Sequence, residues 1–351
     1  MTISSISTSY LATALLPAIN QAQTQLATLQ VESASGEYAN LGLHLGEQSG
    51  QELSLKSHDD LLQTITTSNQ LLTMNISTAT TAIDAISTTA QSAVTSLITY
   101  TTSQNNAASL QTLGEQSLRA LVGNVNATSA GQYVFGGINS GVQPLADYSS
   151  TPPSATQTAM LQAFQTNFGF SPTSANASSI TAASLQSFLT GPFAQQFQGS
   201  NWTATWSSAS STNTTAQIAP GQTIDTSTNA NAPGFQQLAQ GYAMLAAFGG
   251  ANLSAVAQSQ LISTATSLIT QGHSALTQTE ANLGQAQSEI DQANTTMASQ
   301  MTILQTQIGN LDNVSPQKVA TELSTLTTQI ETAYQLTAQI HKLSLAQYLP
   351  A

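Results

Sequence analysis

The most regular feature of the sequence is an apolar residue at steps of three and four. From Leu55 to Leu97 the two steps alternate without a slip, and only His58 and Asn69 are polar positions in the stripe. Such spacing places side chains on one face of an α-helix. The pattern predicts a long helix that packs along one face, and Asn69 within that face is expected to set its register against the partner.

The same spacing recurs over residues 12–29, 283–311 and 319–340, with a break at 312–316. A stripe this narrow and long needs a partner helix. We therefore expect helices from the first and last thirds of the chain to pack antiparallel. The predicted bundle seam consists of Leu62, Ile65, Leu72, Ile76, Ile83, Ile86, Ile290, Met297, Met301, Leu304 and Ile308.

The middle of the chain has a different pattern. A third helical stretch covers residues 110–125, and the β-prone run Gly131–Gly137 follows it. Beyond it, prolines, short helical patterns at 159–168 and 183–189, and turn residues predict a small α+β insert. Within the insert we expect a strand at 201–206, with both tryptophans facing inward, and a hairpin at 215–224.

The fold class predicted is mainly α. A long, coiled-coil-like helical bundle is formed by the N- and C-terminal regions, and a small α+β domain is inserted between them. The predicted segments are an N-terminal assembly helix and loop (1–50) and a C-terminal assembly helix (312–351). Between them lie the first half of the bundle (51–137), the outer insert (138–232) and the second half of the bundle (233–311).

Charge and composition narrow the function classes. Charged residues make up only 6% of the chain, against roughly 25% in ordinary domains. Four Lys and Arg face sixteen Asp and Glu, for a net charge of −12. This balance repels polyanions, so neither nucleic acid nor a membrane surface is expected as a partner. The absence of cysteine excludes disulfides and thiolate sites, and we expect either a cytosolic protein or export without a cleaved signal.

Residues for catalysis or metal binding are scarce. The four histidines lack metal-ligand spacing, and Gly272–Leu276 has only the first half of a nucleophile elbow. We expect no enzyme, no metal and no cofactor. From a different class of function, Trp202 and Trp206 could form a stacking platform for a glycan on the insert, although their spacing fits a buried strand better.

The C-terminus stays apolar to its end, which is unusual for a domain terminus. One interpretation is a helix docked on its own core. The interpretation we favour is an end that becomes ordered by packing on another copy of the chain. The predicted assembly interface consists of Leu15, Ile19, Leu26, Leu29, Ile330, Tyr334, Ile340, Leu343, Leu345, Tyr348 and Leu349.

Four stretches carry a resemblance to a known family: the start through Gly36, Asn40–Gly46, Gly131–Gly137, and residues 327–349. They resemble the bacterial flagellin superfamily, and most closely its hook–filament junction members (hook-associated protein 3) in the branch found in α-proteobacteria. The resemblance covers the helical parts, and the C-terminal match is the most specific. The chain departs from it at Glu37, where the family usually has a basic residue after glycine.

The resemblance implies a secreted structural subunit of the flagellum at the junction between hook and filament. Export would run unfolded through the flagellar type III apparatus, with a chaperone. The terminal helices would form an inner tube, the longer helices the next shell, and residues 138–232 the outer surface. Partners would be further copies, a neighbouring hook-associated protein and flagellin. A filament flagellin is the close alternative, and a surface glycan-binding flagellin homologue a more distant one.

Overall fold

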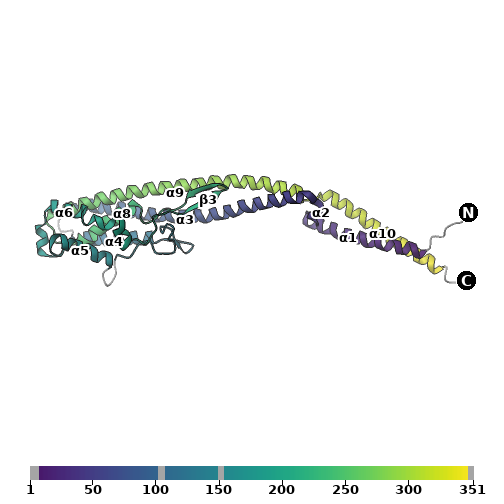
Figure 1. The fold of residues 1–351 in the computed structure, drawn as a ribbon, viewed down its shortest axis with the longest axis horizontal. Coiled ribbons are helices and arrows are strands. Elements are labelled where there is room, and N and C mark those ends of the chain that lie inside the picture. The colour runs from purple at the N-terminus through teal and green to yellow at the C-terminus, as the bar shows by residue number, and fades with distance from the viewer. Residues whose placement is uncertain (1–7, 102–106, 149–153, 347–351) are drawn as a thin grey trace. The chain divides into compact units, whose positions relative to one another are not determined.

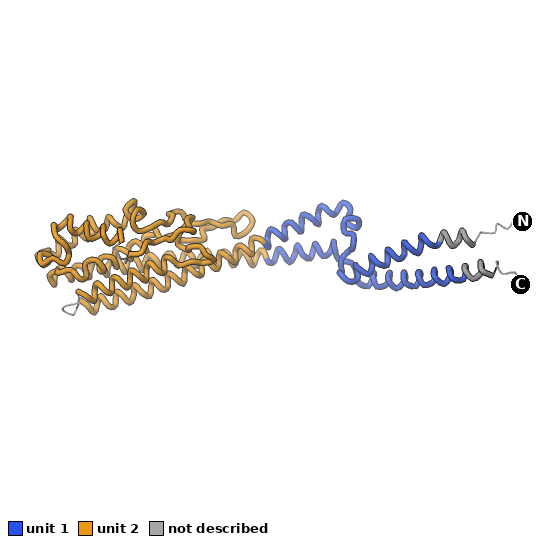
Figure 2. Tube along the Cα trace, turned by 90° about the horizontal axis from the view of Figure 1, so that it is seen from below, with its two compact units in different colours: residues 1–63, 298–351 blue, residues 64–297 orange. Residues whose placement is uncertain are grey.

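The structure is a computed structural model that divides into two compact units (Figure 2). Unit 1 consists of residues 1–63 and 298–351, and unit 2 of residues 64–297. The fold is mainly helical, as predicted. The backbone is described for residues 8–101, 107–148 and 154–346, and side chains for residues 15–100, 107–148 and 154–339.

Helices α3 (Ser49–Thr101) and α9 (Ala255–Asp312) contribute residues to both units. They correspond to the two longest apolar repeats and confirm the helices predicted there. Unit 1 also contains α1 (Thr8–Ser35), α2 (Leu41–Leu45), the 3-10 turn η1 (Gly46–Gln48) and α10 (Pro316–Ala346).

In unit 1, α1 and α10 lie side by side (Figure 1). The predicted break is confirmed, because α9 ends at Asp312 and α10 begins at Pro316. Proline suits this position, since the first turn of a helix needs no hydrogen bond from its N–H group. Within residues 1–50, where a helix and then a loop are predicted, α1 continues to Ser35 and the short helix α2 forms in the connection that follows.

Unit 2 is organised around α4 (Ala107–Val125) and α8 (Pro233–Phe248). Their backbones approach closely at Gly114, where an added Cβ would lie within 2.7 Å of the Leu245 carbonyl carbon. A larger residue would push the two helices apart. Glycine at this position therefore allows the tight packing on which the core of unit 2 is built.

The remaining elements of unit 2 are short. Both sheets are two-stranded and antiparallel. The first has a two-residue loop, Ala130 and Gly131, in which both residues have positive φ, as a type I′ turn requires. The elements are β1 (Thr128–Ser129), β2 (Gln132–Tyr133), α5 (Ala155–Phe168), η2 (Ala175–Ser179), α6 (Ala182–Thr190), η3 (Ala194–Phe197), α7 (Gly199–Thr205), β3 (Thr215–Ala219) and β4 (Gln222–Asp225).

The predicted hairpin is confirmed as β3 and β4, which pair from Thr215 and Asp225 with an irregularity between Gln217 and Ala219. The short helices predicted at 159–168 and 183–189 are confirmed as α5 and α6. Buried residues of this middle region belong to the same hydrophobic core as those of α3, α4, α8 and α9. The middle region is therefore packed into the core of unit 2.

The strand predicted at 201–206 is wrong, because residues 199–205 form helix α7. Trp202 and Trp206 are four residues apart, a spacing that puts side chains on one face in either structure. The backbone N–H of Trp206 donates to the carbonyl oxygen of Trp202 at 2.9 Å, as in a helical turn. The inward orientation of both tryptophans is confirmed, since they are 0% and 1% exposed.

Candidate assembly interface

The α1–α10 pair contains all six of the predicted interface residues whose side chains the structure describes. Ile19, Leu29 and Ile330 are buried, while Leu15 and Leu26 are half-buried. Tyr334 is 50% exposed, and its hydroxyl accepts a hydrogen bond from the Gln23 side-chain amide at 2.6 Å. The apolar stripes of the two ends therefore meet each other within one chain.

The C-terminal part of the predicted interface falls outside the described residues. This applies to the side chains of Ile340, Leu343 and Leu345, and to Tyr348 and Leu349 altogether. For these five residues an assembly role stays a prediction.

Three exposed apolar side chains of unit 1, Leu16, Leu61 and Ile303, lie next to residues of the predicted interface or bundle seam. Leu16 is 58% exposed beside Leu15, and Ile303 is likewise 58% exposed beside the buried Leu304. A neighbouring residue points about 100° away around a helix, so these apolar doublets give a helix a second apolar face. Such pairs of adjacent apolar residues are the feature of the sequence from which these exposed side chains could be predicted. The exposed residues of this kind in unit 1 are Leu16, Val31, Leu43, Leu53, Leu61, Ile303 and Leu336.

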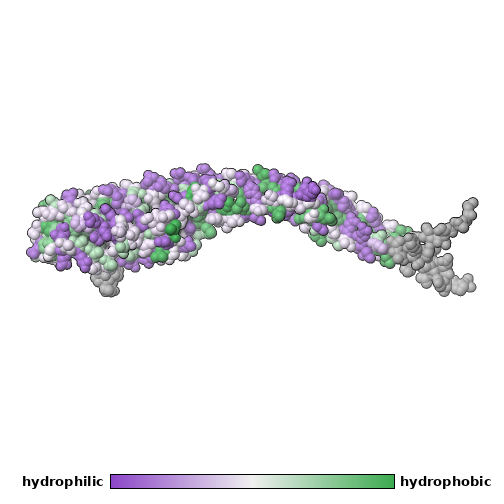
Figure 3. Space-filling view, in the orientation of Figure 1, coloured by the Kyte–Doolittle hydropathy of each residue, from purple (hydrophilic) through white to green (hydrophobic). Residues whose placement is uncertain are grey.

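Figure 3 shows such apolar side chains as green patches on a surface that is mostly purple and white. Leu43 on α2 is 82% exposed and Leu53 on α3 is 67% exposed. Where large apolar side chains with such exposure cluster, the surface is characteristic of a contact with another molecule.

The predicted bundle seam is largely buried in the structure. Buried members are Leu62, Ile65, Ile76, Ile83, Ile86, Ile290, Met297 and Leu304, and half-buried members are Leu72, Met301 and Ile308.

Asn69 joins three elements of unit 2. Its side-chain amide donates to the Asn294 side-chain oxygen on α9 at 2.7 Å and to the Ile218 carbonyl oxygen on β3 at 2.8 Å. Further along, Gln91 of α3 is 3.3 Å from the His273 ring. Numbers rise on α3 as they fall on α9, so the two helices are antiparallel here, as predicted. Because Asn69 is fully buried, any shift in register would leave its amide unpaired.

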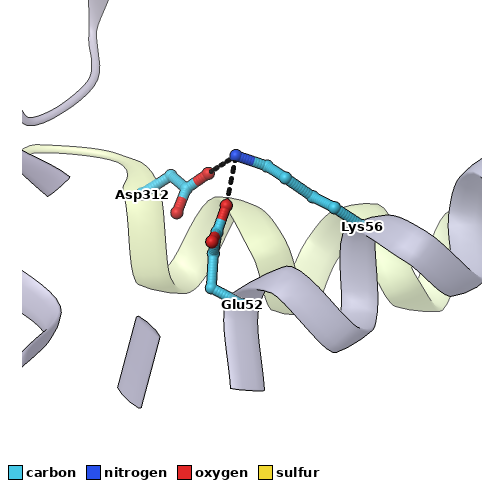
Figure 4. Close-up of polar contacts among 3 residues, drawn as sticks. All are labelled: Glu52, Lys56 and Asp312. Carbon is cyan, nitrogen blue, oxygen red and sulfur yellow. Dashed lines mark ion pairs between the residues drawn. The ribbon is translucent and has the colours of Figure 1, made fainter. Parts of the chain in front are cut away.

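The end of α9 is anchored to the start of α3 within unit 1 (Figure 4). Lys56 forms ion pairs with Glu52 and with Asp312, where its ammonium nitrogen is 2.8 Å from Oδ2. The Asp312 side chain is only 4% exposed. Hydrogen bonds to Asp312 and then Glu52 raise the pKa of Lys56 above its usual range.

Backbone contacts connect residues 36–40 to residues 312–316, close to this ion pair. We call these two connections together the joint. The Val314 N–H donates to the Gly36 carbonyl oxygen at 2.9 Å, and the Tyr38 N–H donates to that of Asp312 at 3.0 Å. Gly36 has φ +79°, a conformation that favours glycine. Two connections far apart in sequence thus hold each other in place.

Comparison with known families agrees with this arrangement. Residues 6–140 match the bacterial flagellin N-terminal helical region, and residues 257–349 match the bacterial flagellin C-terminal helical region. Together the matches cover more than half of the chain. The chain belongs to the bacterial flagellin family. No curated protein matches it.

As a member of the flagellin family, the chain is a structural protein of the extracellular flagellum and not an enzyme. The family implies polymerisation with further copies. The matched parts contain α1 to α4, most of α9 and all of α10. Helices α5 to α8 lie between the two matches, so this middle region is outside the family's matched helical regions.

The described residues include no group of three or more His, Cys, Asp or Glu that could hold a metal ion. Within the same residues, no helix combines the length and hydropathy needed to cross a bilayer. Trp202 donates its indole N–H to the Asn231 side chain at 2.8 Å, and both tryptophan rings are enclosed. The two rings are therefore not open to a glycan, and the predicted alternative of a tryptophan stacking platform is not supported.

Proposed function

We propose that this flagellin-family protein is the subunit of the hook–filament junction. Exported unfolded through the flagellar type III apparatus with the help of a chaperone, it assembles into a ring. The ring contacts a neighbouring hook-associated protein on one side and flagellin on the other.

The observation that carries this proposal is the run Gly131–Gly137. Here the chain leaves the helical body, and the sequence of this run resembles that of junction proteins. In the structure Gly137 has φ +59°, and an added Cβ would lie 2.6–2.7 Å from the carbonyl oxygens of Thr212 and Ser210. Glycine is therefore required at this close approach. The run turns the chain from α4 into the compact middle region.

Deleting the gene for this chain tests the proposal. A cell without the junction subunit should build hooks without filaments and release flagellin into the medium, because export continues while filament growth has no starting ring. Electron microscopy and the amount of flagellin in the medium are the measurements, with the gene restored as the control. Hooks that carry shortened or altered filaments would contradict the junction role and favour the filament-flagellin alternative.

For assembly itself, we propose that the α1–α10 pair forms first and then contacts other copies through its outer faces. The exposed Leu16, Val31, Tyr334 and Leu336 support this, because they lie on the two helices whose seam residues are already buried against each other. Burying such side chains between copies gains about 25 cal/mol per Å² of apolar surface. The predicted residues of the C-terminus would extend this contact.

A single substitution separates assembly from folding. Leu336→Glu should leave the helical content of the monomer unchanged, because Leu336 is 47% exposed, and should raise the concentration needed for assembly at least tenfold, equivalent to about 1.4 kcal/mol. Gln335→Glu, at an adjacent exposed position, adds the same charge without removing an apolar side chain and is the matched control. Normal assembly of both variants would contradict the proposed contact.

A further inference from the structure

Unit 2 has a cavity of about 360 Å³ in the middle region, between α4, α5 and the C-terminal end of α8. This volume is within the range of small-molecule binding sites, roughly 300–1,000 Å³. Apart from Gln111 on α4, every residue that lines the cavity falls outside the two matched flagellin regions. The cavity is therefore a feature of this chain's own middle region.

Small residues make the floor of the cavity. Ala246, Ala247 and Ala251 contribute to it, together with Gly250. A side chain at Gly250 would collide with the side chain of Gln111. Alanine and glycine positions on both sides of the end of α8 thus leave this part of the cavity open, and the Gln111 side chain lies against Gly250.

Three glutamines line the cavity. Gln157 and Gln165 are eight residues apart on α5 and share one face, while Gln111 comes from α4. The Gln111 amide donates to a Glu115 carboxylate oxygen at 2.9 Å, which orients it and leaves its carbonyl oxygen as an acceptor. The side-chain amides of Gln157 and Gln165 make no hydrogen bond in the part of the chain that the structure describes.

The rim of the cavity is fixed by a turn at residues 171–173. Asn252 holds this turn, since its backbone N–H donates to the Pro172 carbonyl oxygen at 3.1 Å and its side-chain amide donates to that of Thr173 at 2.6 Å. The hydroxyls of Ser171 and Thr173 are 3.2 Å apart. A pair of hydroxyls thus stands on a rim that the backbone holds in place.

The lining combines uncharged donors and acceptors with apolar surface. No charged side chain lines the cavity among the described residues, and Leu161, 38% exposed, supplies apolar contact. At the inner side, Tyr148 is buried, and burial raises the pKa of its phenol above the usual range. The phenol therefore stays neutral at any physiological pH.

We propose that this cavity binds a neutral saccharide. A sugar ring presents neighbouring hydroxyls, each of which can donate and accept, and a side-chain amide offers two donors and one acceptor to match them. Its C–H face suits Leu161 and the alanines of the floor. An acidic sugar or a phosphate is disfavoured, because the site has no cation and the chain has a net charge of −12. This proposal does not depend on the hook–filament role.

Titration of the full chain with a panel of sugars tests the proposal. The panel contains glucose, galactose, N-acetylglucosamine and their disaccharides, with glucuronate as the acidic counterpart, followed by calorimetry and ligand-observed NMR. At least one neutral sugar should bind saturably with a dissociation constant of about 1 mM or tighter. Gln157→Ala and Gln165→Ala should each weaken that binding several-fold. Gln186→Ala, at an exposed position of α6 outside the cavity, should not.

Three results would overturn the proposal. The first is the absence of saturable binding by every neutral sugar up to about 50 mM, well above a millimolar dissociation constant. The second is binding that both cavity substitutions leave unchanged, which would place the sugar elsewhere on the chain. The third is binding of glucuronate as tight as that of glucose, which would contradict recognition by an uncharged site.

Discussion

The α1–α10 pair and the α4–α8 core bury their apolar residues to different extents. In the pair, the small core around Leu29, Val319 and Ile330 keeps 4–9% of each side chain exposed. In unit 2, Phe164, Phe193 and Phe248 are completely enclosed. Two helices alone can cover only one face of each other, whereas several layers enclose a core. The pair is therefore the part of the molecule that gains most from further copies.

The largest expected effect comes from the aromatic core of unit 2. The Phe248 ring lies 5.2–5.6 Å from those of Phe164, Phe193 and Phe188. Phe248→Ala should lower the free energy of unfolding by about 3–5 kcal/mol, because it removes a buried ring and leaves a cavity. Denaturant unfolding followed by circular dichroism measures the change. Ile330→Ala in the pair is the comparison, and an equal or larger loss there would contradict the difference between the two regions.

A smaller effect is expected at Asn69. Asn69→Ala removes two hydrogen bonds and leaves the Ile218 carbonyl oxygen without the amide that donates to it. We expect a loss of about 2 kcal/mol in the free energy of unfolding. Asn294→Ala removes only one of these bonds and should cost less. If Asn69→Ala were neutral, this amide would have no part in holding α3 to α9.

Lys56→Met tests the joint. It leaves the Asp312 carboxylate buried without its cation, and the expected loss is about 1 kcal/mol, since Lys56 is 43% exposed and water screens the pair. Faster hydrogen exchange at residues 312–316 is the measurement. Lys318→Met removes an exposed pair at 3.9 Å and should change little.

The pH dependence of this contribution follows from the raised pKa of Lys56 in the folded chain. The stabilisation is fully present below the ordinary pKa of lysine and is lost as the pH rises through the folded value. The difference between the wild-type chain and Lys56→Met should therefore persist from neutral pH to about pH 10 and shrink above it. A difference that disappears between pH 7 and 9 would contradict the ion pairs.

The smallest effect concerns two acids that meet between α3 and α9 in unit 2. Burial and then the charge of Asp84 raise the pKa of Glu280, while His273 opposes the shift. When the pKa of an acid is raised in the folded chain, the charged acid destabilises the fold at pH values above the ordinary pKa. This destabilisation is lost as the pH falls and the acid takes up a proton. Asp84→Asn should therefore raise the melting temperature slightly at pH 7 and less at pH 4. A variant that melts lower at pH 7 would contradict the repulsion.

The sequence predicted the long helices well because their steps of three and four extend over many turns. It failed at Trp202 and Trp206, since a spacing of four fits a strand and one helical turn equally well, and Ala204 midway between them gives these six residues the alternation of a strand. The close approach of α4 and α8 at Gly114 depends on contacts between distant segments, which no local pattern encodes.

The candidate interface was predictable in part. Spacing identified Ile19, Leu29 and Ile330 as residues of the assembly interface, but it could not tell whether these residues would be covered by the same chain or by another copy. Part of the exposed apolar surface follows from doublets such as Leu15–Leu16, of which only one member can face the partner helix. The ion pair between Lys56 and Asp312 joins residues too far apart in sequence to be found without the fold.

Hydrogen exchange of the full chain, as a monomer and after assembly, tests the central claim most directly. We expect amides of α1 and α10 to be less protected than those of α4 and α8 in the monomer and to become strongly protected on assembly, while those of α4 and α8 are strongly protected in both states. Equal protection of the two helix pairs in the monomer, with no gain in α1 and α10 on assembly, would contradict the account.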